Sequence, residues 1–145
     1  MGKNNLNYET VTLDDEKSAI IILNQTKLPN EIEVLTLKEQ EDIWKAIDLL
    51  QVRADSATGV VAAIGVYLAA KAIDTEDFRV FYIHFMEAKK FLETSRPTAV
   101  NLFDSLNRME KIILDNQLRS VTVLKGFLKE EALKIKEEYL ILQGI

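Results

Sequence analysis

Two arginines, Arg53 and Arg96, have the type and the sequence setting to bind an anion. Arg96 directly precedes Pro97, and proline is favoured at the first position of a helix. A guanidinium beside the free N–H groups of a helix start suits a phosphate or a carboxylate, because both donate hydrogen bonds to it. We predict an anion site if the two helix starts converge. The alternative is that both arginines pair with surface carboxylates, which contributes little to stability.

The segment after Arg53 is predicted to form a loop over residues 54–59 that leads into a central helix over residues 60–73. This helix is apolar nearly all round, as expected of a helix covered on several sides. Gly65 within it is expected to permit close approach of a neighbouring helix, because glycine otherwise costs about 1 kcal/mol in a helix.

The other candidates for chemistry favour structural interpretations. His84 is the only histidine and has no convincing acid or nucleophile as a partner. The acidic run Asp14–Glu16 lacks the ligand spacing and the glycine of a calcium loop, so it is predicted to be a solvated turn. Residues 125–136 mix both charge signs at helical spacing and are predicted to form a solvated face. The chain contains no cysteine, and neither a metal nor a cofactor is expected.

Three short strands and about five helices are predicted to position these residues. The strands cover residues 8–13, 19–23 and 31–35, and their polar or proline-containing breaks favour an antiparallel meander. Thr36 and Glu39 fit a capping box at the start of the first helix. Later helices are expected to begin at Asp74 or Thr75, at Pro97, and near residue 117. The fold class is therefore α+β, mostly α: a β-meander (residues 1–36) and a helical bundle (residues 37–145) in one compact domain.

Composition excludes several classes of protein. The chain has 145 residues, 18 Lys and Arg against 23 Asp and Glu, and a formal charge of −5, which argues against nucleic acid or anionic lipid as a partner. Its longest uncharged run, Ser56–Ala70, is shorter than the roughly 20 residues that span a bilayer. A soluble cytoplasmic protein is expected. The apolar C-terminal stretch Tyr139–Ile145 is expected to pack back on the core or to face a partner.

Three motifs carry a resemblance to a known family. They are Asn-Gln-Thr-Lys-Leu-Pro at residues 24–29, Gly-Val-Val-Ala-Ala-Ile-Gly-Val-Tyr at residues 59–67, and Arg-Pro-Thr-Ala-Val-Asn-Leu at residues 96–102. From about Tyr8 to about Lys136 the chain resembles the S-methyl-5-thioribose-1-phosphate isomerases of methionine salvage, which are related to the regulatory subunits of translation initiation factor 2B. The resemblance implies the N-terminal domain alone, without the Rossmann-like domain that supplies the catalytic cysteine and aspartate. It therefore implies a chain that is inactive in isolation.

The resemblance also implies that Arg53 and Arg96 are phosphate-side arginines. The family loop reads Arg-Gly-Ala-Pro-Ala-Ile-Gly, whereas residues 53–59 here read Arg-Ala-Asp-Ser-Ala-Thr-Gly. Ala54 adds a methyl group where backbone should approach the phosphate. Asp55 adds a negative charge, and two unit charges about 5 Å apart repel by about 3 kcal/mol at an effective dielectric near 20. Phosphate binding by residues 53–55 is therefore expected to be weak.

A second hypothesis is an interaction or scaffold module that resembles the initiation-factor relatives. It would use its helices to bind a protein partner, or associate with itself through the apolar stretch 139–145. The sequence is equally compatible with a natural truncation, a fragment and an engineered derivative.

Overall fold

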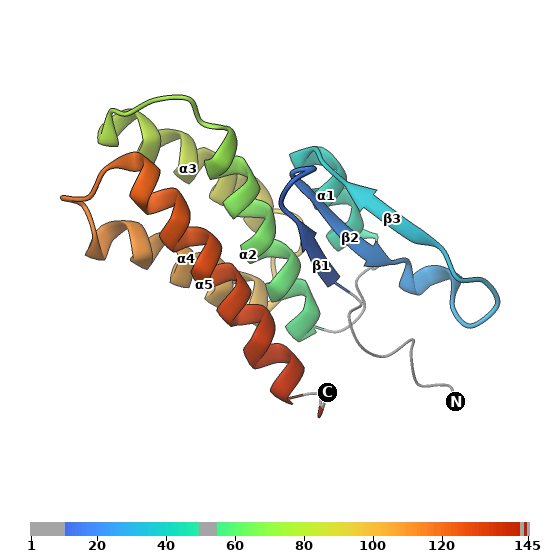
Figure 1. Cartoon of the computed structure of the whole chain (residues 1–145). Helices are drawn as coiled ribbons and strands as arrows, with labels where there is room; N and C mark the ends of the chain where they lie inside the picture. Colours follow the sequence, from blue (N-terminus) through green and yellow to red (C-terminus); the bar gives the residue numbers. More distant parts are fainter. Residues whose placement is uncertain (1–10, 50–54, 143, 145) are drawn as a thin grey trace.

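The computed structural model describes residues 11–49, 55–142 and 144 of the chain. Within them a three-stranded sheet precedes five α-helices (Figure 1), which confirms the predicted fold class. The strands are β1 (Val11–Asp14), β2 (Ala19–Leu23) and β3 (Val34–Leu37). The helices are α1 (Gln40–Asp48), α2 (Asp55–Ala72), α3 (Phe78–Glu93), α4 (Val100–Asp115) and α5 (Val121–Leu142).

The sheet is an antiparallel meander with β2 in the centre. Ile20 of β2 lies opposite Leu13 on one side and Leu37 on the other. Alternate side chains such as Ile20 and Ile22 are buried, as expected of a sheet with one face on the core. The predicted positions 8–10 of the first strand lie outside the described residues.

The predicted capping box at Thr36 is wrong. Thr36 lies in β3, which begins at Val34 and ends at Leu37, one residue past the predicted boundary of the meander. The helix that follows has Glu39 at its N-cap, without a side-chain capping hydrogen bond. The strand pairing of Thr36 with Ile21 outweighs the local capping signal, because register places the neighbouring apolar residues on the core face.

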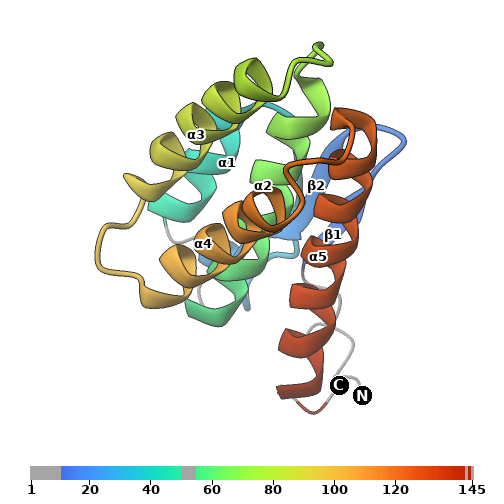
Figure 2. The same ribbon diagram turned by 90° about the vertical axis from the view of Figure 1, so that its left-hand side faces the viewer.

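Helix α2 is the centre of the molecule. It contacts the other four helices and strands β1 and β2, and Figure 2 shows it behind α4 with the sheet beyond it. The predicted loop over residues 54–59 is wrong from residue 55 onward, because α2 already begins at Asp55. Gly65 permits close approach as predicted: a Cβ there would lie 3.1 Å from Cγ2 of Ile43 on α1.

Three further helix starts differ from the prediction: α5 begins at Val121 rather than near residue 117, and α3 and α4 also begin later. Helix α3 begins at Phe78, where the Asp77 carboxylate accepts the N–H groups of Arg79 and Val80 and caps the helix. Helix α4 begins at Val100 rather than at Pro97. The reason is a β-turn before it, in which Ala99 N–H donates to the Arg96 carbonyl at 3.0 Å. Proline at the second position of such a turn has a suitable φ.

The turn between β1 and β2 is not simply solvated, because Asp15 connects it to two helices. Its carboxylate accepts hydrogen bonds from Tyr67 at 2.8 Å and from Lys71 at 3.2 Å, both on α2, and lies 3.1 Å from Lys129 on α5. We call these four side chains the Asp15 junction.

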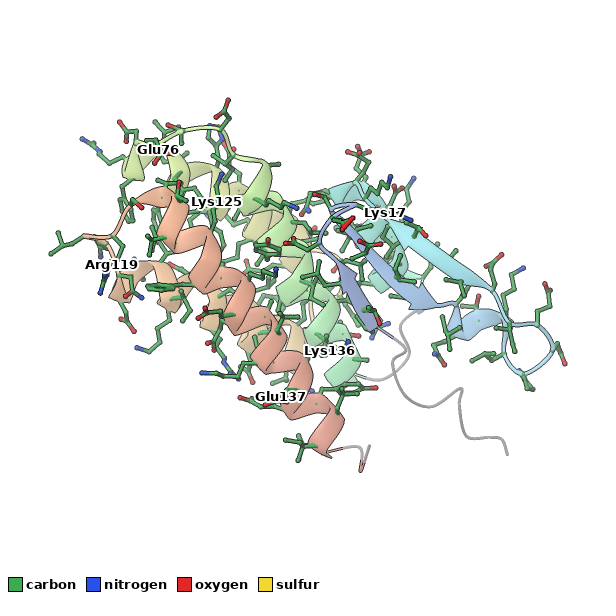
Figure 3. The ribbon with its side chains drawn as sticks, viewed as in Figure 1. Lys17, Glu76, Arg119, Lys125, Lys136 and Glu137 are labelled. Carbon is green, nitrogen blue, oxygen red and sulfur yellow. The ribbon has the colours of Figure 1, made fainter. Side chains whose placement is uncertain are left out.

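The predicted solvated face over residues 125–136 is wrong in part for the same reason. Lys129 belongs to the Asp15 junction. Lys125, labelled in Figure 3, donates to the Ile73 carbonyl at 2.6 Å near the C-terminal end of α2. A cation at this end of a helix satisfies carbonyls that have no partner within the helix.

Candidate functional site

Arg96 lies in the connection between α3 and α4, and its half-buried side chain joins α1 to α2. Nη2 donates to the carbonyl of Ile47, near the C-terminal end of α1, at 3.0 Å. Nη1 donates to Oγ1 of Thr58, in the first turn of α2, at 3.2 Å. We call Arg96, Ile47 and Thr58 the Arg96 junction.

The backbone around Arg96 is fixed on both sides. Before it, the buried Ser95 donates to the Leu92 carbonyl through its hydroxyl at 2.6 Å and through its N–H at 3.1 Å. After it comes the β-turn that ends at Ala99. The position from which the arginine side chain extends is therefore set by the end of α3 and by the turn.

The structure places Arg96 beside a helix start, but a different one from that predicted. Ile47 and Thr58 lie on either side of the segment 50–54, which contains Arg53. Arg53 and Ala54 lie outside the described residues, and of Asp55 the structure describes the backbone, at the first position of α2. The convergence of Arg53 and Arg96 therefore stays a prediction.

The arrangement of Arg96 has the chemistry of an anion site. Helix N-termini carry partial positive charge and favour anions. Beside this helix start the guanidinium donates to a carbonyl and to a hydroxyl, and these two hydrogen bonds help to orient the group. A planar guanidinium so oriented can offer paired N–H groups to a phosphate or a carboxylate.

The first turn of α2 is held against α4 by a contact that only glycine permits. A Cβ at Gly59 would lie 2.6 Å from Oγ of Ser105 and 2.9 Å from the carbonyl oxygen of Asn101. These distances are shorter than van der Waals contact, so a side chain at position 59 would force the two helices apart. Gly59 therefore fixes the distance between α4 and the turn that carries Thr58.

Sequence reasoning missed Thr58. It is fully buried, and it is the one polar side chain in the run from Ala57 to Ile64. A single hydroxyl in such a run is a usable signal, because buried polar groups almost always have a hydrogen-bond partner.

Two other basic side chains among the described residues, His84 and Arg108, contact carboxylates. His84 is exposed on α3, and its Nδ1 lies 3.0 Å from Oε1 of Glu87 one turn later. Among the described residues, no group of three His, Cys, Asp or Glu is placed to hold a metal ion. Arg108 of α4 forms ion pairs with two glutamates of α5. It donates to Glu131, and it donates two hydrogen bonds of 2.7 Å to the carboxylate of Glu138. It joins these two helices.

The C-terminal end of α5 is a second region of interest. It extends beyond the other helices (Figure 2) and carries Ile141, 67% exposed, and Leu142, 80% exposed. Leu142 and Tyr139 also line a hollow of about 170 Å³ beside Asn101 and Arg108 of α4. None of the described helices is long and apolar enough to cross a membrane.

Comparison with known proteins agrees with the motifs. The initiation factor 2 subunit family matches residues 51–143. A methylthioribose-1-phosphate isomerase of Symbiobacterium thermophilum is 45% identical over 130 residues, which cover 90% of this chain and 36% of that protein. A 5-deoxyribose 1-phosphate isomerase of Clostridium botulinum is 42% identical over 125 residues, which cover 86% of this chain and 36% of that protein.

Two solved structures share the fold. The 5-methylthioribose 1-phosphate isomerase from Pyrococcus horikoshii matches with a TM-score of 0.84 and 32% identity. The translation initiation factor eIF-2B subunit delta from A. fulgidus matches with a TM-score of 0.79 and 34% identity. Each match covers 89% of this chain and 36% of the other. The chain thus spans about a third of the length of these proteins.

Proposed function

This chain belongs to the initiation factor 2 subunit family, and from that premise we propose that it is the phosphate-side, N-terminal portion of an aldose–ketose isomerase. The reaction is the conversion of 5-methylthioribose 1-phosphate to 5-methylthioribulose 1-phosphate by moving a hydrogen between C1 and C2. Two relatives named for the isomerisation of a 1-phosphorylated sugar support this proposal. We place this function in the cytoplasm, with the sheet and the helices acting as one domain.

The observation that carries the proposal is the position of Arg96. Its guanidinium is oriented at the first turn of α2 by two uncharged acceptors. A sugar phosphate offers a dianionic group at one end, and a guanidinium at a helix start complements that group. In the proposal Arg96 and Arg53 bind the phosphate end of the sugar phosphate.

Alone, the chain is proposed to bind without turnover. It contains no cysteine. Moving the hydrogen needs a group that removes a proton from one carbon and returns it to the next. His84, the only histidine, lies exposed on α3, where its Nδ1 is 3.0 Å from Oε1 of Glu87.

The test compares 5-methylthioribose 1-phosphate with 5-methylthioribose, which lacks the phosphate. We expect the first to bind and the second not to bind, as measured by calorimetric titration. Arg96→Gln should abolish binding and Arg96→Lys should weaken it, since lysine keeps the charge but loses the paired donors. Equal binding of both sugars, or turnover above a blank by the isolated chain, contradicts the proposal.

A second candidate function is that of an interaction module. The exposed Ile141 and Leu142 at the projecting end of α5 favour it, since large apolar side chains together at a surface mark contacts. Size-exclusion chromatography with light scattering tests self-association: Leu142→Asp should dissociate the assembly. Leu118→Asp, at a fully exposed site in the turn before α5, is the matched control and should change nothing. A wild-type chain that stays monomeric at high concentration contradicts self-association.

A further inference from the structure

We propose that the hollow between α4 and α5 is a binding site for a small aliphatic amine in its ammonium form. The two helices pack against each other, and Figure 2 shows them diverging toward the beginning of α4 and the end of α5. The α4–α5 hollow has a volume of about 170 Å³. It is lined by other residues than the Arg96 junction and takes a ligand of the opposite charge, so this inference does not depend on the proposed function.

The α4–α5 hollow has a polar wall and an apolar wall. One face of α4 forms the polar wall, with Asp104, Ser105 and Arg108. These positions are three or four residues from one another or adjacent, so they share a face of the helix. The central helix and α5 form the apolar wall, with Val60, Ile135 and the ring of Tyr139. A ligand that matches both walls has a polar end and an apolar body.

The hydroxyl of Ser105 indicates that the polar wall meets a ligand. Ser105 lines the hollow and is only 9% exposed, yet its side chain makes no hydrogen bond with any of the described residues. Its Oγ lies beside Gly59, which has no side chain to offer. Buried hydroxyls almost always have a hydrogen-bond partner, and a hydroxyl oxygen can accept two hydrogen bonds. Ser105 therefore offers an acceptor to a molecule in the hollow.

The charges around the hollow favour a cation. Arg108 pairs with Glu131 and Glu138, so its guanidinium is already satisfied by carboxylates. Lys134 also attracts Glu138 and helps to lower the pKa of its carboxyl. Asp104, exposed at the polar wall, forms no ion pair with the described residues. Among these groups the carboxylates exceed the cations by one, and the excess charge is that of Asp104.

An ammonium group on a short aliphatic chain matches this arrangement. It has three N–H donors and no acceptor, and the Asp104 carboxylate and Ser105 Oγ both accept. The aliphatic chain can pack against Val60 and Ile135, and the face of the Tyr139 ring attracts a cation. The hollow is smaller than the roughly 300 Å³ at which pockets for drug-sized ligands begin, so the amine must be small.

Amide NMR titration of the full chain with n-butylammonium chloride tests the proposal, and n-butanol is the uncharged probe of the same shape. We expect n-butylammonium to bind with a dissociation constant in the millimolar range and to shift the amides of residues 104–108 and 135–139. The affinity for n-butanol should be at least about tenfold lower, because the alcohol lacks the charge that complements Asp104.

Three variants locate the binding. Ser105→Ala removes the buried acceptor and keeps a good helix former, and it should weaken n-butylammonium binding about 3- to 10-fold. Asp104→Asn keeps the size of the side chain and should weaken binding about tenfold. Glu137→Gln removes the same charge from an exposed site of α5 (Figure 3) that does not line the hollow, so it should stay within twofold of wild type.

The outcomes are separate from those of the phosphate test. Arg96→Gln should bind n-butylammonium as wild type does, even where it loses phosphate. The amine site is overturned if n-butylammonium shifts no amide of the hollow or if n-butanol binds equally well. It is also overturned if neither Ser105→Ala nor Asp104→Asn weakens binding. Equal weakening by Glu137→Gln and Asp104→Asn would show attraction to a negative surface instead of a site, and would overturn it as well.

Discussion

The Asp15 junction and the Arg96 junction lie at different places in the fold and are built alike. In each, one partly buried charged side chain ties together elements that are far apart in the sequence. Asp15 ties the β1–β2 turn to α2 and α5, and Arg96 ties the α3–α4 connection to α1 and α2. The difference lies in what they are tied to. Asp15 forms ion pairs with two lysines. The hydrogen bonds by which Arg96 connects α1 to α2 go to a carbonyl and a hydroxyl.

The partners of Asp15 explain its titration. Partial burial raises the pKa of this carboxyl, but the hydrogen bonds from Tyr67, Lys129 and Lys71 outweigh burial and lower the pKa below its ordinary value of 3.8. The pKa of the Tyr67 hydroxyl is raised above its ordinary value, first by burial and second by its hydrogen bond to Asp15. The Asp15 junction is thus satisfied by groups of the chain itself and has a structural role.

The comparison teaches that a charged side chain in this fold must be judged by its partners rather than by its neighbours in sequence. The acidic run that contains Asp15 looks like a solvated turn, yet Asp15 is a structural hub. Arg96 looks like one of many arginines at helix ends, yet it donates to a carbonyl of α1 and to a hydroxyl of α2.

The largest effect is expected at Gly59, which holds the Arg96 junction together. Gly59→Ala places a Cβ within 2.6 Å of Ser105 and 2.9 Å of the Asn101 backbone. Because packed helices must shift to relieve such overlap, we expect a loss of roughly 2–3 kcal/mol in the free energy of unfolding. Urea unfolding measures it. An unchanged midpoint would show that α2 and α4 are not in this close contact.

Next in size is Asp15→Asn, which removes the charge at the centre of its junction. We expect a loss of roughly 1.5–2 kcal/mol at pH 7, because hydrogen bonds to a charged group are the stronger kind. The neighbouring Asp14→Asn is the matched control, since Asp14 accepts only the exposed N–H of Lys17 among the described contacts. It should change stability by less than about 0.5 kcal/mol.

The stability difference between wild type and Asp15→Asn should decrease at acid pH. A lowered folded-state pKa means that the contribution of Asp15 is complete above about pH 3.8 and is lost as the pH falls through the folded-state pKa. The gap in stability between wild type and Asp15→Asn should therefore be full at pH 7 and close at lower pH. A gap that is constant down to pH 2 would contradict a charged Asp15 in the folded protein.

A smaller effect, on affinity, is expected from the double variant Ala54→Gly/Asp55→Ala. It removes the methyl group of Ala54 and the negative charge of Asp55, which we expect to lie beside the predicted anion. We expect phosphate to bind about tenfold more tightly, equivalent to about 1.4 kcal/mol, as measured by NMR titration. The single variant Ala54→Gly is the control that separates the methyl group from the charge. No gain in either variant would show that residues 54 and 55 do not face the anion.

The smallest effect is expected at Gly126, the counterpart of Gly59. Gly126 lies in α5, and a Cβ there would meet no atom within 4 Å. Because glycine is a poor helix former, Gly126→Ala should raise the free energy of unfolding by about 0.5–1 kcal/mol. Thermal unfolding measures the gain. A loss instead would mean that this face of α5 is covered.

The sequence predicts elements better than their ends. The meander and the five helices follow from alternation and helical spacing, which burial enforces along a whole element. Helix ends depend on one or two local hydrogen bonds and are harder to predict. Thr36, predicted at a helix start, pairs with Ile21 in the sheet. Pro97, also predicted at a helix start, lies in a β-turn.

The candidate site could be predicted only in part. Arg96 is identifiable from its motif, but its partners are not, because Ile47 contributes a backbone carbonyl and Thr58 a hydroxyl within an apolar run. The partners of Asp15 are hidden from the sequence for a related reason. Its lysines lie more than fifty residues away, and no local pattern announces contacts between elements so far apart.

The most direct test of the account is an amide NMR titration of the wild-type chain with inorganic phosphate. We expect shifts confined to the Arg96 junction and the beginning of α2, at Thr58 and Gly59, with the amides around Asp15 unmoved. We also expect that Arg96→Gln erases these shifts while Asp15→Asn leaves them in place. Shifts centred on the lysines of the Asp15 junction, or none at all, would contradict the account.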